Sequence, residues 1–173
     1  MKPRTLIFTG EGKGKTTAAF GMVLRAVGHG QRVLVVQFLK SNAASGELLA
    51  GARLPQVEMV QMGRGFVPSP TNPAFADHCE TARTALAFAK QAIVSGKYDF
   101  IVLDEICGAV ALELIEEDAV IEMLSALERK ACVVLTGRHA SPRLIECADT
   151  VTEMQCIRHG YTQGIAAQEG VEF

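Results

Sequence analysis

The residues Thr9-Gly10-Glu11-Gly12-Lys13-Gly14-Lys15-Thr16-Thr17 form a glycine-rich stretch near the start of the chain. They follow the apolar run Thr5-Leu6-Ile7-Phe8, which is typical of a buried strand, and they precede a segment with helical character. A glycine-rich loop between a strand and a helix is the context of a phosphate-binding loop. Glycines let backbone N–H groups approach a phosphate closely, and the helix N-terminus adds partial positive charge. The stretch therefore predicts that the protein binds the triphosphate of a nucleotide, and we expect this nucleotide to be ATP with magnesium.

Two side chains of this loop have expected catalytic roles. We expect Lys15 to reach the outer phosphates and Thr16 to ligate magnesium through its hydroxyl. The usual pattern G-x-x-x-x-G-K-[ST] would place a glycine at Thr9, whereas here the glycine comes one position later. Glu11 places a carboxylate beside the phosphate site. We therefore expect its side chain to point away from the phosphates or to bind the metal or the ribose. The expected nucleotide-binding residues are Gly10, Glu11, Gly12, Lys13, Gly14, Lys15, Thr16, Thr17 and Arg138.

A second strand-like run, Phe100-Ile101-Val102-Leu103, ends in Asp104-Glu105. Parallel strands bring such carboxylates to the sheet edge that carries the phosphate loop, where they can hold magnesium directly or through water. We therefore expect Glu105 to be catalytic with Lys15 and Thr16, and we expect the metal ligands to be Thr16, Glu105 and Asp104. The alternative is that the acidic pair only supplies a favourable charge at a helix N-terminus.

Arg138 follows the next strand in the sequence Thr136-Gly137-Arg138. Its guanidinium could clamp a phosphate at the same sheet edge. The alternative is a surface arginine near Glu146.

Short apolar runs alternate with helix-like stretches along the chain, which is the pattern of a parallel α/β sheet. Several runs are apolar throughout, so helices should cover both faces of the sheet. We expect a single P-loop α/β domain over residues 1–173, with three layers, a mostly parallel sheet and a RecA-like architecture. The expected strands are Thr5–Phe8, Val33–Leu39, Val57–Val60, Phe100–Leu103, Cys132–Leu135 and a sixth at about Thr150–Met154.

Helix signals flank these runs. The first helix should start near Thr16 and end at the glycines of Gly28-His29-Gly30. A second should follow Asn72-Pro73, with asparagine as its N-cap and proline in the first turn, and should stop at Gly96. Its apolar residues are spaced four, three, four, three, four, which gives one packed stripe. They are Phe75, Cys79, Ala82, Leu86, Ala89 and Ile93.

Residues 63–73, Gly-Arg-Gly-Phe-Val-Pro-Ser-Pro-Thr-Asn-Pro, lie between two such elements. Their glycines and prolines exclude regular structure, so we expect a loop at the sheet edge. A loop that carries Phe66 is a candidate binding element. The alternative is a surface connection with Phe66 tucked onto the body of the protein.

Composition excludes several classes of protein. A formal net charge of −2 over 173 residues gives no reason to expect general binding of nucleic acid, which needs a concentrated basic surface. The apolar runs are far shorter than a membrane span, and no signal peptide precedes the first strand, so we expect a cytoplasmic protein. The five cysteines contain no C-x-x-C pair and the four histidines are dispersed, so neither a disulfide framework nor a zinc site is expected. Four cysteines lie in or beside apolar segments and are expected to be buried.

A further set of stretches carries a similarity that runs along the whole chain: Gly10–Gly21, Arg25–Gly30, Val35–Lys40, Gly63–Phe66, Val102–Glu105, Leu135–Arg138, and the tail with Arg158-His159-Gly160, Gly164, Ala167-Gln168, Gly170 and Phe173. In these stretches the chain resembles the CobA/BtuR-type cob(I)alamin (corrinoid) adenosyltransferase family. The resemblance runs from about Leu6 to Phe173, and the extended phosphate loop and the tail carry most of its specificity.

This resemblance implies transfer of the 5′-deoxyadenosyl group of ATP to the cobalt of a reduced corrinoid, with release of triphosphate. Co(I) is a powerful nucleophile, so no protein nucleophile or general base is required. The protein has to position C5′ against cobalt and neutralise the departing triphosphate, through Lys15, the loop amides and magnesium on Thr16 and Glu105. The resemblance also implies a corrinoid partner (cobalamin or a cobyrinic or cobinamide precursor), a reductase or flavodoxin-like electron donor, and a homodimer.

In the same family an aromatic loop displaces the lower axial ligand of cobalt and leaves a four-coordinate Co(II) that is easier to reduce. Phe66 matches its first aromatic residue, so the expected corrinoid-binding residues are Phe66 and Gly65. The second aromatic, a tryptophan in well-known members, falls near Pro68, and this chain contains no tryptophan. Only residues 1–4 stand where members carry an N-terminal arm, so a lid made by that arm is expected to be missing, and Glu11 replaces the usual asparagine.

Two other functions remain open at this point. One is an ATPase or kinase that transfers the γ-phosphoryl group, with Glu105 activating water and Arg138 stabilising charge. The other is a non-catalytic module that binds ATP or corrinoid and turns over neither. The products separate them, since only adenosyl transfer releases triphosphate. The preferred corrinoid, and a role in de novo synthesis or in salvage, are left open.

Overall fold

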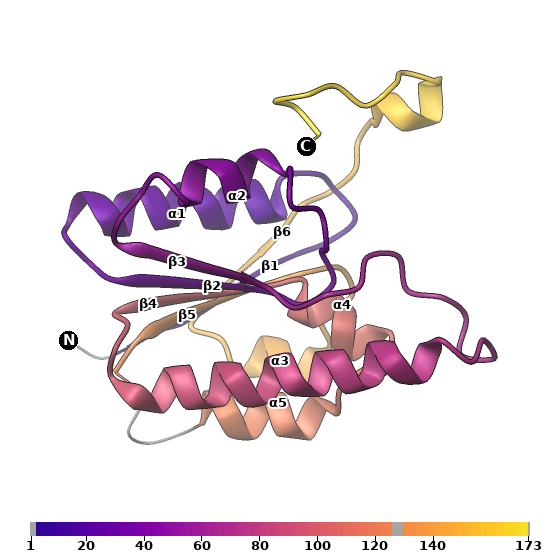
Figure 1. Ribbon diagram of the computed structural model, residues 1–173. Helices are drawn as coiled ribbons and strands as arrows, with labels where there is room; N and C mark the ends of the chain where they lie inside the picture. The colour runs from indigo at the N-terminus through magenta and orange to yellow at the C-terminus, as the bar shows by residue number, and fades with distance from the viewer. Residues whose placement is uncertain (1–2, 126–129, 173) are drawn as a thin grey trace.

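Six parallel strands form one sheet in the order β3-β2-β4-β5-β1-β6 (Figure 1). The computed structural model describes residues 3–125 and 130–172. All six expected strands are present, which confirms the parallel α/β class. The strands are β1 Thr5–Thr9, β2 Val33–Gln37, β3 Val57–Gln61, β4 Phe100–Asp104, β5 Cys132–Thr136 and β6 Thr150–Glu153.

Helices cover both faces of the sheet, as the continuous apolar strands predict. Successive strand residues point to opposite faces, so Val33 and Val35 of β2 pack with Ala19 and Val23 of α1, while Leu34 packs in the core on the other face. The two cores make the three-layer arrangement of Figure 1. The α1 face holds α1 (Lys15–Gly28) and α2 (Gly46–Gly51); the other holds α3 (Phe75–Ser95), α4 (Ile106–Ala111), α5 (Glu117–Leu124) and α6 (Pro142–Glu146).

The start of α3 differs from the sequence-based expectation. The helix begins at Phe75 with Ala74 as its N-cap, so Asn72 and Pro73 lie outside it. The Asn72 side chain accepts a hydrogen bond from the Ala74 N–H at 2.9 Å, and the Asn72 carbonyl accepts one from the Phe75 N–H at 2.9 Å. Asparagine therefore closes a turn that leads into the helix. The stripe from Cys79 to Ile93 is buried, and Gly96 ends the helix with φ 66°, as expected.

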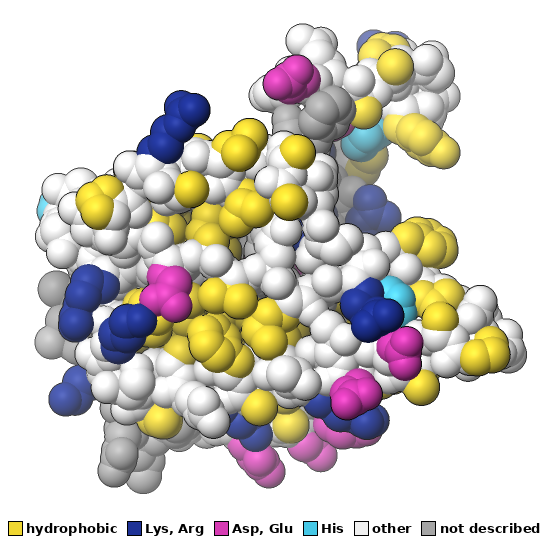
Figure 2. Space-filling model, in the orientation of Figure 1, with side chains coloured by type: hydrophobic (Ala, Val, Ile, Leu, Met, Phe, Trp, Pro, Cys, Tyr) yellow, Lys and Arg dark blue, Asp and Glu magenta, His cyan; other side chains and the backbone are white. Residues whose placement is uncertain are grey.

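The segment after β6 leaves the body of the protein and includes a short helix, η1 (Gly160–Gln163). Figure 2 shows it standing off the rest of the surface, with apolar side chains on it. Ile157 and Tyr161 are among its exposed apolar residues. The segment turns back toward the phosphate loop at its end, where Glu172 pairs with Lys13. Phe173, which ends the stretch that carries the family resemblance, and the first two of residues 1–4 lie outside the described residues.

The cysteines are less uniformly buried than expected. Cys79 and Cys107 are buried, Cys132 and Cys147 are half-buried, and Cys156 is exposed. Within the described residues, His, Cys, Asp and Glu form no group of three or more that could hold a metal ion. The helices in that part of the chain are too short or too polar to cross a membrane.

Candidate nucleotide-binding site

The phosphate loop lies where β1 runs into α1, pressed against the end of β6. The Gly12 N–H donates to the Met154 carbonyl at 2.6 Å, and the Met154 N–H donates to the Thr9 carbonyl at 2.8 Å. Gly10 has φ 95° and Gly14 has φ 111°, both in the region that favours glycine. The displaced first glycine therefore has a structural reason, because a Cβ at Gly10 would lie 2.5 Å from the Met154 carbonyl oxygen.

We expect Gly12→Ala to destabilise the protein. The added Cβ would lie 2.7 Å from the carbonyl oxygens of both Met154 and Gln155, and backbone at this distance has to move. Overpacking of this kind costs about 1–3 kcal/mol. Urea unfolding measures the effect, with Gly21→Ala as the matched control. No atom lies within 4 Å of a Cβ at Gly21 in α1, so this variant should be stabilised by about 0.5–1 kcal/mol. Equal midpoints for Gly12→Ala and wild type would contradict the described loop.

Lys15 occupies the centre of the loop and is buried. Its ammonium group donates hydrogen bonds to the carbonyls of Gly10 at 2.8 Å and Gly12 at 2.7 Å. Burial lowers the pKa of Lys15, while the nearby Glu105 carboxylate opposes this shift. The loop thus holds a cation at the point where a phosphate would have to bind.

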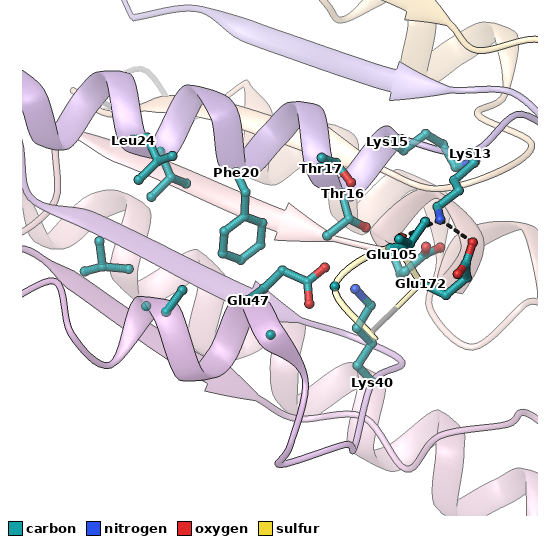
Figure 3. Close-up of a pocket in the computed structure, with 18 of the residues that line it drawn as sticks. Lys13, Lys15, Thr16, Thr17, Phe20, Leu24, Lys40, Glu47, Glu105 and Glu172 are labelled. Carbon is teal, nitrogen blue, oxygen red and sulfur yellow. Dashed lines mark hydrogen bonds and ion pairs between the residues drawn. The ribbon is translucent and has the colours of Figure 1, made fainter. Parts of the chain in front are cut away.

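A cavity of about 550 Å³ opens from the phosphate loop along α1 (Figure 3). One end is polar and includes Lys15, Thr16 and Glu105; the other is apolar and lies between α1 and α2. Figure 3 shows Lys40 and Glu47 extending into the space between these ends. A cavity with one charged end and one apolar end fits a ligand with a charged tail and a ring system. The apolar end is formed by Phe20, Val23, Leu24, Ala50, Leu54 and Val57.

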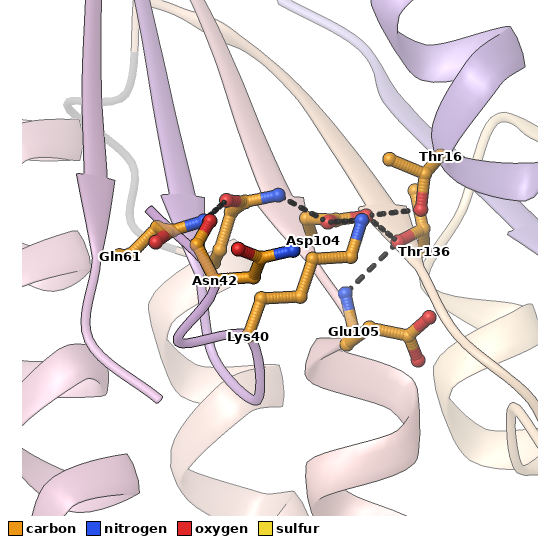
Figure 4. A network of polar contacts seen from close by, with 8 residues as sticks. Thr16, Lys40, Asn42, Gln61, Asp104, Glu105 and Thr136 are labelled. Atoms are coloured by element: carbon orange, nitrogen blue, oxygen red, sulfur yellow. Dashed lines mark hydrogen bonds and ion pairs between the residues drawn. The ribbon is translucent and has the colours of Figure 1, made fainter. Parts of the chain in front are cut away.

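Asp104 is the hub of the polar end (Figure 4). Its side chain is fully buried, and its Oδ1 accepts from the Thr16 hydroxyl at 2.8 Å and the Thr136 hydroxyl at 2.7 Å. Its Oδ2 accepts from the Gln37 amide at 2.9 Å and pairs with the Lys40 ammonium at 3.2 Å. The strand order explains this meeting, because β5 lies between β1 and β4 and brings Thr136 beside Asp104.

Glu105 differs from Asp104 in its surroundings. It adopts φ 65°, a left-handed conformation that is uncommon for a residue other than glycine, and its N–H donates to the Thr136 hydroxyl at 2.9 Å. Burial raises the pKa of Glu105, and the neighbouring Asp104 carboxylate raises it further. Its carboxylate has no hydrogen-bond or ion-pair partner among residues 3–125 and 130–172. This carboxylate, on the cavity wall, is therefore available to a ligand.

The structure pairs Glu11 with Arg138, at 3.2 Å, and both side chains are exposed. His139 lies 3.5 Å from the same carboxylate. Glu11 therefore points away from the inside of the loop. Arg138 does not line the cavity. It is a surface arginine, as the alternative in the sequence analysis states, but its ion-pair partner is Glu11 and not Glu146. Lys13 pairs with Glu172 of the C-terminal segment at 2.7 Å.

Phe66 is 93% exposed, so the alternative that it is tucked onto the body is wrong. Its loop is nevertheless anchored, because the N–H of Gly65, which has φ 85°, donates to the Leu39 carbonyl at 2.8 Å. A Cβ at Gly63 would overlap the Leu39 backbone, so this segment lies directly on the loop after β2. The structure places Phe66 and Gly65 outside the lining of the cavity.

Four polar residues at the site were not predicted from the sequence as site residues. Gln37 and Thr136 bind Asp104 from the neighbouring strands, Lys40 pairs with it, and Glu47 lines the cavity. A polar Gln37 at the end of an otherwise apolar strand was a usable signal, since a buried amide needs partners. Lys40 lies after the end of that strand, where a lysine is ordinary, so its position in the sequence did not point to the site.

Comparisons with known proteins agree across the whole chain. The family model described as ATP:corrinoid adenosyltransferase BtuR/CobO/CobP matches residues 1–173. The chain is 43% identical over 169 residues to a corrinoid adenosyltransferase of Pseudomonas aeruginosa, covering 97% of this chain and 82% of the relative. It is 37% identical over 174 residues to the corrinoid adenosyltransferase CobA of Salmonella typhimurium, covering 97% of this chain and 84% of the relative.

Solved structures with low sequence identity share the fold. A KaiC-like protein from Pyrococcus horikoshii superposes with a TM-score of 0.56 at 18% identity, covering 88% of this chain and 72% of that chain. ATPases 2 and 3 of EssC from Geobacillus thermodenitrificans give a TM-score of 0.52 at 14% identity, covering 97% of this chain and 35% of that chain. These similarities support the expected RecA-like P-loop architecture.

Proposed function

The chain belongs to the ATP:corrinoid adenosyltransferase family, and we propose that its reaction takes place at the polar end of the cavity beside the phosphate loop. The enzyme transfers the 5′-deoxyadenosyl group of ATP to the Co(I) of a reduced corrinoid. A cobalt–carbon bond forms, the bond from C5′ to the triphosphate oxygen breaks, and triphosphate leaves with the electron pair. Family membership favours this reaction over transfer of the γ-phosphoryl group.

The observation that carries the proposal is the contact at 2.8 Å between the hydroxyl of Thr16, which lines the cavity beside Lys15, and the buried carboxylate of Asp104 behind it. It joins the end of the phosphate loop to the end of β4, as nucleotide binding requires. We propose that residues 10–17 bind the triphosphate through backbone N–H groups and Lys15. The apolar end of the cavity offers a surface for the nucleoside.

The residues present fit a magnesium ion. Thr16, Asp104 and Glu105 supply a hydroxyl and two carboxylates, and Mg²⁺ prefers oxygen donors of this kind. The Glu105 carboxylate is half-buried on the cavity wall, and its raised pKa shows that the charges of Lys40, Lys15 and Arg138 do not fully compensate it, so a cation would stabilise it further. When bound, magnesium would neutralise part of the charge of the triphosphate. We therefore propose these three residues as its ligands.

The protein's own part in the reaction is positioning and charge stabilisation. Lys15 would hold its positive charge against the triphosphate, which gains negative charge as its bond to C5′ breaks. The buried Asp104 keeps the Thr16 hydroxyl in one orientation, which fixes the phosphate end of the substrate. No proton has to be removed from the nucleophile, so a general base is not needed.

We propose that Phe66 and Gly65 bind the corrinoid. A fully exposed phenylalanine on an anchored loop can pack against the lower face of a corrin ring and occupy the space of the axial ligand. The Gly65–Leu39 hydrogen bond holds the base of this loop in place. Arg138 is a further proposed triphosphate contact, which would require it to leave Glu11.

We expect Glu105→Gln to weaken the response to magnesium more than it weakens corrinoid binding. The substitution keeps the size of the side chain and removes a charge from the cavity wall. The magnesium concentration at half-maximal rate should rise by roughly 10-fold or more. Reaction rates at increasing magnesium concentration measure this change. Glu117→Gln is the control, because Glu117 pairs with Arg143 and does not line the cavity. Superimposable curves for Glu105→Gln and wild type would leave Glu105 as a helix-end charge and Asp104 as the better ligand.

Three further features of the proposal rest on the family resemblance. We propose that the enzyme acts in the cytoplasm as a homodimer and receives electrons from a reductase or flavodoxin-like donor. Sedimentation velocity tests the dimer, which requires a mass twice that of one chain. A single-chain mass at micromolar concentration would contradict it.

A further inference from the structure

Asp104 has all of its hydrogen-bonding capacity in use. Two hydroxyls bind Oδ1, while the Gln37 amide and the Lys40 ammonium share Oδ2. A fully buried carboxylate requires compensation of its charge, and Lys40 is the only cation paired with Asp104 among residues 3–125 and 130–172. A magnesium ion that reached Asp104 would therefore meet a site in which a positive charge is already present.

Lys40 differs from the other three partners in its freedom to move. Thr16, Gln37 and Thr136 lie in helix α1 and strands β2 and β5, whereas Lys40 follows the end of β2. Its side chain is 31% exposed and lines the cavity beside Lys15 and Glu105. A lysine side chain carries its charge on a flexible four-carbon stem, so it can change partners without movement of the backbone.

The backbone at this point is fixed. The Phe38 N–H donates to the Asp104 carbonyl at 3.0 Å, and the Leu39 carbonyl accepts from Gly65. The root of the Lys40 side chain is thus held beside the metal site whatever its ammonium group binds. Repulsion between an ammonium and a divalent cation a few ångströms apart favours departure of the ammonium. The Glu105 carboxylate, whose charge Lys40 already offsets in part, would itself hold the metal. The attraction left for the ammonium would then be the triphosphate, which enters with the metal.

We propose that Lys40 holds the place of the metal at Asp104 in the empty site and moves onto the triphosphate when the magnesium nucleotide binds. Lys40 then acts twice: it keeps divalent cations away from Asp104 until nucleotide is present, and it adds a second lysine charge to the departing triphosphate. This inference rests on the proposed magnesium and triphosphate site.

Two binding measurements on Lys40→Met test the inference without turnover. Electron paramagnetic resonance at pH 8 gives the affinity for Mn²⁺ alone, and calorimetry with inorganic tripolyphosphate at saturating Mg²⁺ gives the affinity for the anion. Removal of the ammonium should tighten Mn²⁺ binding and weaken tripolyphosphate binding, each by roughly 10-fold or more, the size of one charged hydrogen bond. Lys97→Met is the matched control, because Lys97 pairs with Glu58 at 2.7 Å on the surface and should change neither constant.

Opposite changes in the two constants support the exchange of partners. Tighter Mn²⁺ binding with unchanged tripolyphosphate affinity would make Lys40 a fixed neutraliser of Asp104 and overturn the inference. Unchanged Mn²⁺ affinity would overturn it as well. Lys40→Gln, which keeps a donor for Asp104, gives the same two readings if Lys40→Met does not fold. Failure of the wild type to bind magnesium tripolyphosphate would instead refute the proposed site itself.

Discussion

Lys15→Ala should lower the rate of adenosyl transfer by a factor of roughly 10² to 10³ while the fold is retained. The ammonium of Lys15 lies at the centre of the phosphate loop, within 2.8 Å of two loop carbonyls. Its charge matters most as triphosphate leaves, because the triphosphate then gains negative charge. An interaction that strengthens in the transition state contributes to the rate of the chemical step.

The pH dependence of the wild-type rate should also reveal the charge of Lys15. Burial lowers the pKa of Lys15, so the free enzyme loses this charge at a lower pH than an ordinary lysine would. The value of kcat/KM for ATP, which reports the free enzyme, should fall on the alkaline side for this reason. In Lys15→Ala that fall should disappear.

Steady-state kinetics with pre-reduced corrinoid measure the effect of Lys15→Ala. The matched control is Lys90→Ala, because Lys90 lies on α3 and pairs with Glu122 at 4.0 Å, away from the cavity. A folded Lys15→Ala protein with a near-normal rate would remove the phosphate loop from the mechanism.

Phe66→Ala should separate two substrates that differ in the oxidation state and in the lower axial ligand of cobalt. The variant should turn over pre-reduced Co(I) corrinoid almost normally, since the triphosphate site is untouched. It should fail with Co(II) corrinoid and a mild biological reductant, because five-coordinate Co(II) is harder to reduce. The exposed phenylalanine is the group that would take the place of the lower ligand.

The ratio of the two rates needs no absolute calibration, and ATP affinity serves as an internal control. Val94→Ala is the matched control: it shortens an exposed apolar side chain on α3, outside the Phe66 loop, and should leave the ratio unchanged. Equal losses with both substrates would make Phe66 a general substrate contact. No loss with either would make its loop a surface connection. Because Pro68 stands near the position of the second aromatic, the ratio should be smaller than in family members that have both.

The sequence predicted the features that depend on local pattern. Continuous apolar runs identified β2 and β4, because burial on both faces leaves no alternation. The glycines and Lys15 identified the phosphate loop. The start of α3 was misplaced, since Asn72 and Pro73 favour a helix start and a turn equally. In the structure the asparagine closes the turn.

The contacts that shape the site could not be predicted in the same way. Lys40 with Asp104, Glu11 with Arg138 and Lys13 with Glu172 join residues that are far apart in the chain. Strand order decides two of these pairs: β2 beside β4 brings Lys40 to Asp104, and β1 beside β5 brings Glu11 to Arg138. The close approach of Met154 to Gly12 is also a tertiary contact that the sequence does not predict. It explains why glycine stands at position 12, where the phosphate-loop motif accepts any residue.

The central claim is that ATP is cleaved at C5′ and that cobalt receives the adenosyl group. The most direct measurement is anaerobic incubation of the protein with ATP, magnesium and chemically reduced Co(I) corrinoid, with the spectrum and the phosphate products recorded together. The account predicts a photolabile cobalt–carbon bond and one triphosphate released for each bond formed. Release of ADP or orthophosphate, without a cobalt–carbon bond, would contradict it.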